Sequence, residues 1–268
     1  MRIIAIGDTH GHDTYRQIIE KEINNCDLII FIGDYLDTTN PELTCAIQLY
    51  ELNNILLLKE QYPDKVILLC GNHDHHYLSA AIQKQDTASG FQDFSHYNYT
   101  PIIEKAIREE KLQLAYSYKE LLFTHAGVSN SWLKVNEIPN DENLVQTLND
   151  ILIYKPLVYG YMYTWDLVVK GRKMGNIDKS LKTQSFYAHE KGNAILYSPI
   201  WIRPQSLFND LPNGYIQIVG HTSTIQPKFY KNVKKRIEMI TIDCLGSKCY
   251  LEIIENDEGE FEFNTKDI

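Results

Sequence analysis

Five short clusters of the sequence combine aspartate, histidine and asparagine, which are good ligands for divalent metals. The clusters are Gly7-Asp8-Thr9-His10-Gly11, Gly33-Asp34-Tyr35-Leu36-Asp37, Gly71-Asn72-His73-Asp74, Thr124-His125-Ala126-Gly127 and Val219-Gly220-His221-Thr222. Oxygen and imidazole ligands suit manganese, iron, zinc or magnesium, whereas soft-metal sites are built from thiolates. Two such cations close together can hold a phosphoryl group and activate a water for in-line attack, and one aspartate can bridge both cations. The residue types therefore indicate a two-metal phosphoryl site.

The first three clusters each follow an apolar segment that predicts a buried strand. These segments are Arg2–Ile6, Leu28–Ile32 and Val66–Cys70, with helical patterns between them at Tyr15–Asn24 and from Asn40-Pro41 to about Tyr62. Strands that are apolar throughout and alternate with helices predict a parallel sheet covered on both faces. Ligands of open α/β sheets bind at the carboxyl ends of the strands, so we expect the three clusters to meet at one edge.

The last two clusters also follow predicted strands, at Glu120–Thr124 and Tyr215–Val219. Glycine permits a tight turn from strand to loop and a close approach to a ligand, and it precedes four of the candidate ligands. These four are Asp8, Asp34, Asn72 and His221. We therefore expect each ligand to be presented from a rigid strand end.

The rest of the chain is expected to complete one domain over residues 1–268. Residues 77–112 are partly helical in pattern, and three further strands are predicted at Arg236–Asp243, Tyr250–Ile254 and Glu260–Phe263. Residues from about 130 to 205 have a mixed pattern rich in aromatic side chains. We interpret that segment as an insertion over the site.

The composition is that of a soluble globular protein, with 44% hydrophobic and 23% charged residues. A net charge of −9 lacks the electrostatic footprint of a protein that binds duplex nucleic acid. The basic group from Lys228 to Arg236 predicts a solvated hairpin, with a phosphate-contacting patch as the alternative. Five sparse cysteines, no long apolar run and no signal-like start predict reduced thiols, no membrane span and a cytoplasmic setting.

As a set, the five motifs resemble those of the calcineurin-like metallophosphoesterases. Within that superfamily the chain looks most like the phosphoprotein-phosphatase branch and its bacterial and phage relatives. The motifs run from residue 7 to residue 222 and so cover most of the chain. The resemblance implies an α/β (α+β) fold, a four-layer sandwich of two mixed β-sheets flanked by helices.

The resemblance also implies roles for individual residues. Asp8 and His10 would hold the first metal, Asp34 would bridge both, and Asn72, His125 and His221 would hold the second. Manganese is the expected metal, with iron, zinc, nickel or magnesium as alternatives. His73 would be a general acid beside the leaving-group oxygen, oriented by Asp37, because a carboxylate on one ring nitrogen fixes the tautomer and favours imidazolium.

The sequence departs from the phosphatase pattern at the phosphate-binding positions. The second motif of that branch usually continues with an arginine that clamps phosphate, but here Thr38-Thr39 follows Asp37, and the third motif ends in Asp74 instead of glutamate. Arg203 is a candidate replacement, and the alternative is an arginine stacked on Trp201. Ser223 stands where many phosphodiesterases of the superfamily have a second histidine, which favours a phosphatase.

Three functions are compatible with these patterns. The leading hypothesis is hydrolysis of a phosphomonoester, such as phosphoserine or phosphothreonine on a protein. The second is pyrophosphate-bond cleavage in a dinucleoside polyphosphate, whose bases could stack on aromatic residues of the insertion. Those residues are Tyr159, Tyr161, Tyr163, Trp165 and Tyr187. The third is a non-catalytic scaffold, which the complete set of ligands and the retained His73 disfavour.

Overall fold

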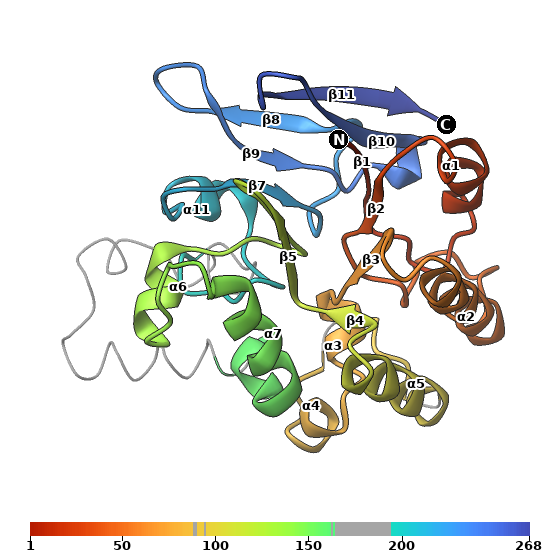
Figure 1. Ribbon diagram of the computed structural model, residues 1–268. Helices are drawn as coiled ribbons and strands as arrows, with labels where there is room; N and C mark the ends of the chain where they lie inside the picture. The colour runs from red at the N-terminus through yellow and green to blue at the C-terminus, as the bar shows by residue number, and fades with distance from the viewer. Residues whose placement is uncertain (88–89, 94, 162, 164–193) are drawn as a thin grey trace.

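The computed structural model describes residues 1–87, 90–93, 95–161, 163 and 194–268, and these residues build two β-sheets (Figure 1). The first sheet consists of β1 (Arg2–Ile6), β2 (Leu28–Phe31), β3 (Val66–Leu69), β4 (Leu112–Gln113), β10 (Cys249–Glu255) and β11 (Phe261–Asp267). Its order is β11-β10-β1-β2-β3-β4. The pairs from β1 to β4 are parallel, whereas β10 pairs antiparallel with both β1 and β11. The sheet is therefore mixed.

The second sheet is also mixed, with the order β5-β6-β7-β9-β8. Its strands are β5 (Ala115–Tyr118), β6 (Leu121–Thr124), β7 (Ile216–Val219), β8 (Lys228–Lys231) and β9 (Ile237–Thr241). The pairs β6–β7 and β7–β9 are parallel, and the two outer pairs are antiparallel. The antiparallel pairing of β8 with β9 confirms the hairpin predicted for the basic segment.

The alternation of side chains along the strands separates two cores. In β1, Ile3 and Ala5 are buried between the sheets together with Phe123 of β6. Ile4 and Ile6 point to the other face and pack into the core beneath the helices. Because successive side chains of a strand point to opposite faces, an all-apolar strand serves both cores. This explains why the first strands of the sequence carry no polar face.

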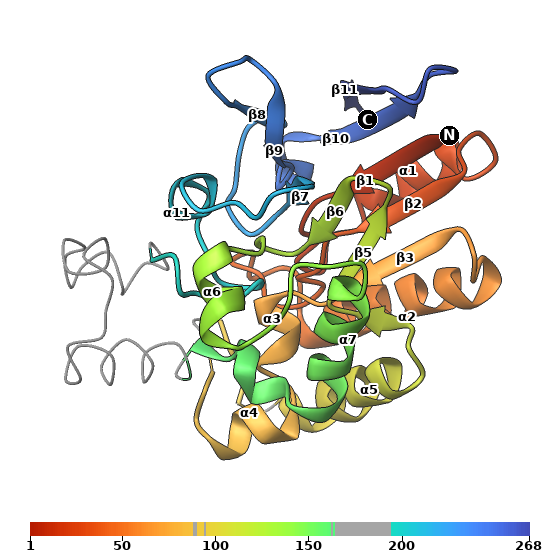
Figure 2. The same ribbon diagram turned by 60° about the vertical axis from the view of Figure 1, so that its left-hand side comes forward.

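Helices cover the outer faces of the sandwich (Figures 1 and 2). The helices of the described residues are α1 (Tyr15–Glu22), α2 (Cys45–Gln61), α3 (Asn72–His75), α4 (Ser79–Gln83), α5 (His96–Arg108), α6 (Asn130–Val135), α7 (Leu144–Tyr154) and α11 (Pro204–Phe208), with short 3-10 turns η1 (Pro156–Tyr159) and η2 (Leu245–Ser247). Ile18 of α1, Ile55 of α2 and Ile103 of α5 belong to the helix-side core. The predicted fold class, two mixed sheets flanked by helices, is confirmed.

One helix boundary differs from the prediction. The helix expected to begin at Asn40-Pro41 begins at Cys45, and its N-cap is Thr44, whose hydroxyl accepts a hydrogen bond from the Ile47 amide at 3.4 Å. The side chain of Asn40 instead accepts from the amide of Glu42 at 3.0 Å, which makes a turn. Asparagine stabilises turns and helix N-caps by the same kind of hydrogen bond, so an asparagine before proline is compatible with either a turn or the start of a helix.

The expected insertion is described only in part. Residues 130–161 form α6, α7 and η1, while residues 162 and 164–193 lie outside the described residues, among them Trp165, Tyr187 and His189. No helix within the described part of the chain is long and apolar enough to cross a membrane.

Candidate active site

The ends of five strands bring the predicted metal ligands together. Asp8 follows β1, Asp34 follows β2, Asn72 begins α3 just after β3, His125 follows β6 and His221 follows β7. The first three residues come from one sheet and the two histidines from the other. The group therefore lies where the carboxyl ends of both sheets meet, as the strand order predicted.

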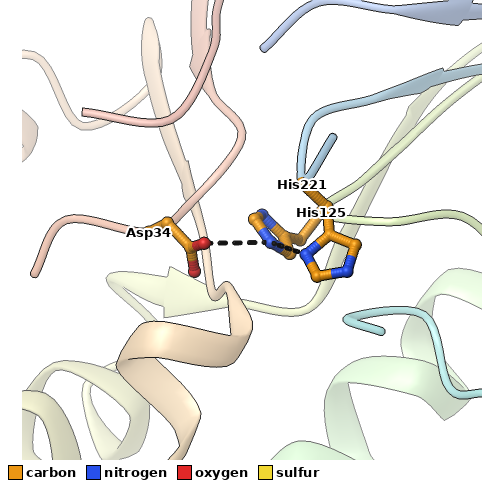
Figure 3. A group of neighbouring side chains, drawn as sticks. All are labelled: Asp34, His125 and His221. Atoms are coloured by element: carbon orange, nitrogen blue, oxygen red, sulfur yellow. Dashed lines mark hydrogen bonds and ion pairs between the residues drawn. The ribbon is translucent and has the colours of Figure 1, made fainter. Parts of the chain in front are cut away.

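Four ligand atoms converge around His125, and Figure 3 shows three of the side chains pointing toward one another. The Nε2 atom of His125 lies 3.0 Å from Asn72 Oδ1, 3.3 Å from Asp34 Oδ2 and 3.3 Å from His221 Nδ1. His125 and Asn72 are buried, and Asp34 is buried with them. Such a cluster of oxygens and nitrogens is the donor set that a divalent metal needs.

The hydrogen bonds on the outer side of the rings decide which nitrogens face inward with a lone pair. His125 Nδ1 lies 2.9 Å from the carbonyl oxygen of Ile32, and His221 Nε2 lies 3.1 Å from that of Trp201. A carbonyl oxygen only accepts, so both outer nitrogens carry the proton. In the neutral rings the inner nitrogens then face each other as lone pairs 3.3 Å apart. Two facing lone pairs repel unless a metal ion or a proton lies between them, so the residues present fit a metal.

A second group of potential ligands shares Asp34 with the first. It consists of Asp8, His10 and Asp34. The Nδ1 atom of His10 donates to the carbonyl oxygen of Leu36 at 3.0 Å, and its Nε2 atom faces Asp34 Oδ2 at 3.9 Å. All three histidines therefore donate the outer N–H to a backbone carbonyl, which is how metal-binding imidazoles are usually oriented. Asp34 occupies the position expected of a bridging carboxylate.

The pKa values of the buried groups show how strongly these charges interact. Burial and the neighbouring Asp243 carboxylate raise the pKa of Asp8 well above its usual range. Burial alone would lower the pKa of His125, but the carboxylates of Asp34 and Asp8 raise it to about 9. Burial lowers the pKa of His221, and nearby positive charge lowers it further. A cation or a proton is thus needed to balance the carboxylates.

Backbone conformation at the site is unusual and depends on close glycine contacts. His10, Asp34, Asp37 and His221 all have positive φ values, of 46°, 54°, 60° and 63°. Non-glycine residues rarely adopt this region, and such strain clusters at functional sites. A Cβ atom on Gly71 would lie 2.1 Å from Asp34 Oδ1, so glycine is required there.

The predicted dyad of His73 and Asp37 is present beside the candidate metal ligands. His73 Nδ1 lies 2.9 Å from Asp37 Oδ2, and His76 Nε2 contacts the same oxygen at 2.6 Å. The other oxygen of Asp37 accepts from the hydroxyl of Tyr77 at 2.6 Å and from Gln92 Nε2 at 2.9 Å. Asp37 is thus fixed by contacts from four side chains.

The charge state of the dyad agrees with a role in proton donation. Burial lowers the pKa of His73, but the carboxylates of Asp34 and Asp37 outweigh it and raise the pKa to about 9. Burial raises the pKa of Asp37, and its contacts with His73 and His76 outweigh this and lower it. The stable pair is therefore an imidazolium beside a carboxylate.

Two residues near the site, His76 and Asp243, were assigned no role from the sequence. His76 shares Asp37 with His73, and Asp243 follows β9 and lines the same cavity as Asp8. Asp243 was detectable, because it ends a predicted strand as Asp8 and Asp34 do. His76 follows α3 directly, so its only signal was its closeness to the third motif, and the positive φ of Asp37 also helps to bring it to that carboxylate.

Asp74 has a bracing role. Its buried carboxylate accepts hydrogen bonds from the amides of Asp34 and Gly71 through Oδ2, at 2.9 and 2.8 Å, and from the amide of Tyr35 through Oδ1 at 2.9 Å. Burial and the Asp34 carboxylate raise its pKa to about 7. Asp74 therefore holds the second and third motifs together and does not face the phosphate position.

Arg203 lies next to the last motif, as the sequence suggested. Its Nη1 atom donates to the carbonyl oxygen of His221 at 2.9 Å and to the hydroxyl of Thr222 at 3.1 Å. Burial lowers its pKa, while the carboxylates of Asp34 and Asp8 act in the opposite direction. The guanidinium is thus anchored within electrostatic reach of the Asp34 carboxylate. Trp201 packs edge-on against the ring of His221, with centroids 5.8 Å apart.

Comparison with known proteins decides the family. A family model of the calcineurin-like phosphoesterases matches residues 1–170, which is more than half of the chain. The chain belongs to this family. It is accordingly a hydrolase that acts on phosphate ester bonds, and members of its family use divalent metals.

Solved structures of phosphatases resemble this calcineurin-like phosphoesterase in fold. A mutant of a cold-active protein tyrosine phosphatase shares 16% identity and a TM-score of 0.54, with 98% of this chain and 80% of that chain covered. A protein serine/threonine phosphatase from Saccharomyces cerevisiae has 16% identity, a TM-score of 0.49 and coverages of 100% and 80%. A metallophosphoesterase from Sphaerobacter thermophilus has 12% identity, a TM-score of 0.49 and coverages of 100% and 88%. No curated protein matches the chain.

Proposed function

We propose that this phosphoesterase is a two-metal phosphomonoesterase of the serine/threonine protein phosphatase type. The observation that carries the proposal is the inward orientation of three histidines around the shared carboxylate of Asp34. Each of them donates its outer N–H to a backbone carbonyl, which leaves the inner nitrogen for a metal. Manganese is the metal that the family resemblance leads us to expect, and the oxygen and imidazole ligands also suit iron, zinc, nickel or magnesium.

The proposed ligands form two groups with one common member. Asp8, His10 and Asp34 would hold one cation, and Asp34, Asn72, His125 and His221 would hold the other. Two divalent cations, when bound, would supply Lewis acidity toward the phosphoryl oxygens and a nucleophilic water. Arg203 lies beside the last motif and would orient the phosphate through its guanidinium.

The dyad of His73 and Asp37 would deliver the proton that the leaving group needs. As water adds to phosphorus and the ester P–O bond breaks, the leaving oxygen gains negative charge. His73 is held by Asp37 through Nδ1, so its Nε2 proton is the one that can pass to that oxygen. The products are inorganic phosphate and the neutral alcohol, and His73 is left neutral until solvent reprotonates it.

The substrate type follows from the last motif. Ser223 stands in place of the second histidine that many phosphodiesterases carry, and it lines the cavity next to the proposed first metal position. We therefore expect monoesters to be hydrolysed faster than diesters. Kinetics on p-nitrophenyl phosphate and bis-p-nitrophenyl phosphate, with metal content measured for each preparation, test this directly.

The decisive test combines metal content with turnover. Protein loaded with manganese should bind two equivalents and hydrolyse p-nitrophenyl phosphate, and Asp34→Asn should lose both activity and metal because it serves both groups. A matched control is Asp210→Asn, since Asp210 lies on the loop after α11 and hydrogen-bonds the amide of Ser131. Protein that holds two manganese, iron, zinc, nickel or magnesium ions and hydrolyses no phosphomonoester would refute the proposal.

Dinucleoside polyphosphate hydrolysis remains the second candidate because a cavity of about 530 Å³ adjoins His73. The aromatic argument for it is weaker than the sequence suggested. Tyr159 is fully buried, stacks on Trp132 with ring centroids 5.6 Å apart and donates to the carbonyl oxygen of Leu148, so it cannot stack on a base. Comparing rates on diadenosine tetraphosphate and on a phosphoserine peptide separates the two candidates.

A further inference from the structure

A cavity next to the dyad extends well beyond the metal ligands. Its volume is about 530 Å³, and its walls include His73, Asp37 and the ligands Asp8 and His10. It continues along Thr38 and Thr39 to the η2 turn. There it is lined by Leu245, Gly246 and Lys248. Thr38 and Thr39 are the residues found where the family resemblance led us to expect a phosphate-clamping arginine.

The position of His73 indicates which part of a substrate enters this cavity. A general acid must lie within hydrogen-bond reach of the leaving-group oxygen. If His73 is that acid, the leaving group lies on the side of His73, and the cavity that His73 lines receives the rest of it. The cavity would therefore recognise the leaving group, whereas Arg203, which is not in its walls, would serve the phosphoryl group.

Lys248 is the unusual residue of this cavity. Of the described residues that line it, Lys248 alone carries a permanent positive charge, among the carboxylates of Asp8, Asp37 and Asp243. Its side chain is exposed, and within the described part of the chain no carboxylate forms an ion pair with its ammonium. Two divalent cations would balance the carboxylates of the site, which leaves the Lys248 charge to act on a ligand.

The backbone around Lys248 is fixed in a conformation that lysine seldom adopts. Its φ is +59°, its amide donates to the carbonyl oxygen of Leu245 at 2.9 Å, and its own carbonyl accepts from the amide of Ile268 at 3.0 Å. Lysine is not favoured in this left-handed region, whereas glycine and asparagine are. Lys119 and Lys235 also have positive φ values, of 52° and 61°, so this conformation fixes the position of Lys248 in the cavity wall but does not by itself mark a functional residue.

We infer that Lys248 recognises a negatively charged group on the leaving group of the substrate. This inference rests on the proposed phosphoesterase function of the same site. The preferred substrates are phosphoesters whose leaving group carries a carboxylate or a second phosphate, and the hydroxyl-bearing residues Thr38, Thr39 and Ser223 line the same cavity. Lys248 thus acts on the leaving group, whereas the arginine expected after Asp37 would have bound the phosphoryl group.

The test compares esters that differ in the charge of the leaving group. Phenyl phosphate is the neutral reference, and 4-carboxyphenyl phosphate and 1,4-phenylene bisphosphate supply a carboxylate and a second phosphate on the leaving group. For each, kcat/KM is divided by the value for phenyl phosphate in the same enzyme, so that intrinsic reactivity cancels between variants. Lys248→Asn, which suits a positive φ, should reduce one or both ratios about three- to tenfold, the size of one charged contact at an exposed site. Which ratio falls shows whether the anion is a carboxylate or a phosphate.

The control is Lys235→Asn. Lys235 has a φ of +61° in the β8–β9 turn and is not among the residues of the cavity, so the change matches in charge and conformation. It should leave both ratios unchanged, and Lys248→Arg should retain them. In the unmodified enzyme both ratios should also fall as the salt concentration is raised from low to physiological, because salt screens the attraction between an exposed lysine and an anion. This measurement requires no variant.

The outcomes separate the two proposals. If the metal-loaded enzyme hydrolyses none of these esters, the proposed function fails. If it hydrolyses phenyl phosphate but Lys248→Asn leaves both ratios unchanged, or the ratios are insensitive to salt, the inference about Lys248 is wrong and the proposed function stands. A fall in a ratio for Lys248→Asn but not for Lys235→Asn supports the inference.

Discussion

Replacing Asp37 by asparagine should remove most of the contribution of His73 to catalysis. At an effective dielectric constant of about 20, an imidazolium and a carboxylate 2.9 Å apart attract by about 6 kcal/mol. Asparagine also fits this position poorly. Both oxygens of Asp37 face donors, since Oδ2 contacts two histidines and Oδ1 accepts from Tyr77 and Gln92, so the N–H₂ group of an asparagine would face donors in either orientation. The loss in kcat cannot exceed the full contribution of a general acid to the rate, which is about 10²- to 10⁴-fold, or about 3 to 5 kcal/mol in the activation free energy.

Two features distinguish this loss from general damage to the site. First, Asp37→Asn, His73→Asn and the double variant should reduce kcat by similar factors, because the two residues act as one unit. Second, the loss should be larger for phenyl phosphate than for 2,4-dinitrophenyl phosphate, whose leaving oxygen needs no proton. The assay is kcat for a series of aryl phosphates at saturating manganese, with metal content measured for each variant. Additive losses in the double variant, or equal losses across the series, would refute the acid role of the dyad.

Three further predictions concern the backbone of the site, a carboxylate beside it and a buried ion pair elsewhere in the fold. Gly71→Ala should lower stability by about 1 to 3 kcal/mol and weaken metal binding, because its Cβ would lie 2.1 Å from Asp34 Oδ1; unchanged thermal unfolding and manganese affinity would contradict this. Asp243→Asn should weaken manganese binding about 10- to 100-fold without lowering the unfolding temperature, as a titration followed by calorimetry can check. Burial raises the pKa of Glu22, but its contacts with Arg2 and Tyr250 outweigh this and place the pKa below its usual 4.5. The ionised Glu22 therefore stabilises the folded protein above about pH 4.5, and this stabilisation is lost as the pH falls through the lower pKa of the folded state. In urea unfolding, Glu22→Gln should lower the free energy of unfolding by about 1 to 3 kcal/mol at pH 7 and by much less at pH 2. An equal cost at both pH values would count against the Arg2 pairing.

The sequence predicted the strands of the site well because burial on both faces leaves a simple pattern. Ile3 to Ile6 are apolar without interruption, and the structure buries alternate members in two different cores. The polar residue that follows such a strand is conspicuous, which is why Asp8 and Asp34 were identified. Asp243 follows a strand in the same way, and it was missed because it belongs to no motif of the family resemblance.

Contacts that depend on local backbone geometry were not predictable in the same way. The start of α2 at Cys45 depends on a competition between two side-chain caps, those of Asn40 and Thr44, that differ little in energy. His76 reaches Asp37 because α3 is one short turn and because Asp37 adopts a positive φ. Neither condition leaves a periodic pattern in the sequence.

The three histidines show how the fold prepares a metal site before any metal is considered. Each imidazole is oriented by a backbone carbonyl, of Leu36, Ile32 or Trp201, and not by a side chain. The first two carbonyls belong to the loop and strand around Asp34, so the bridging carboxylate and two of the rings are positioned by the same short segment. A substitution that shifts this segment, such as alanine at Gly71, therefore disturbs both groups of ligands together. The chemistry of the site thus depends on the backbone between residues 32 and 36 as much as on the ligands themselves.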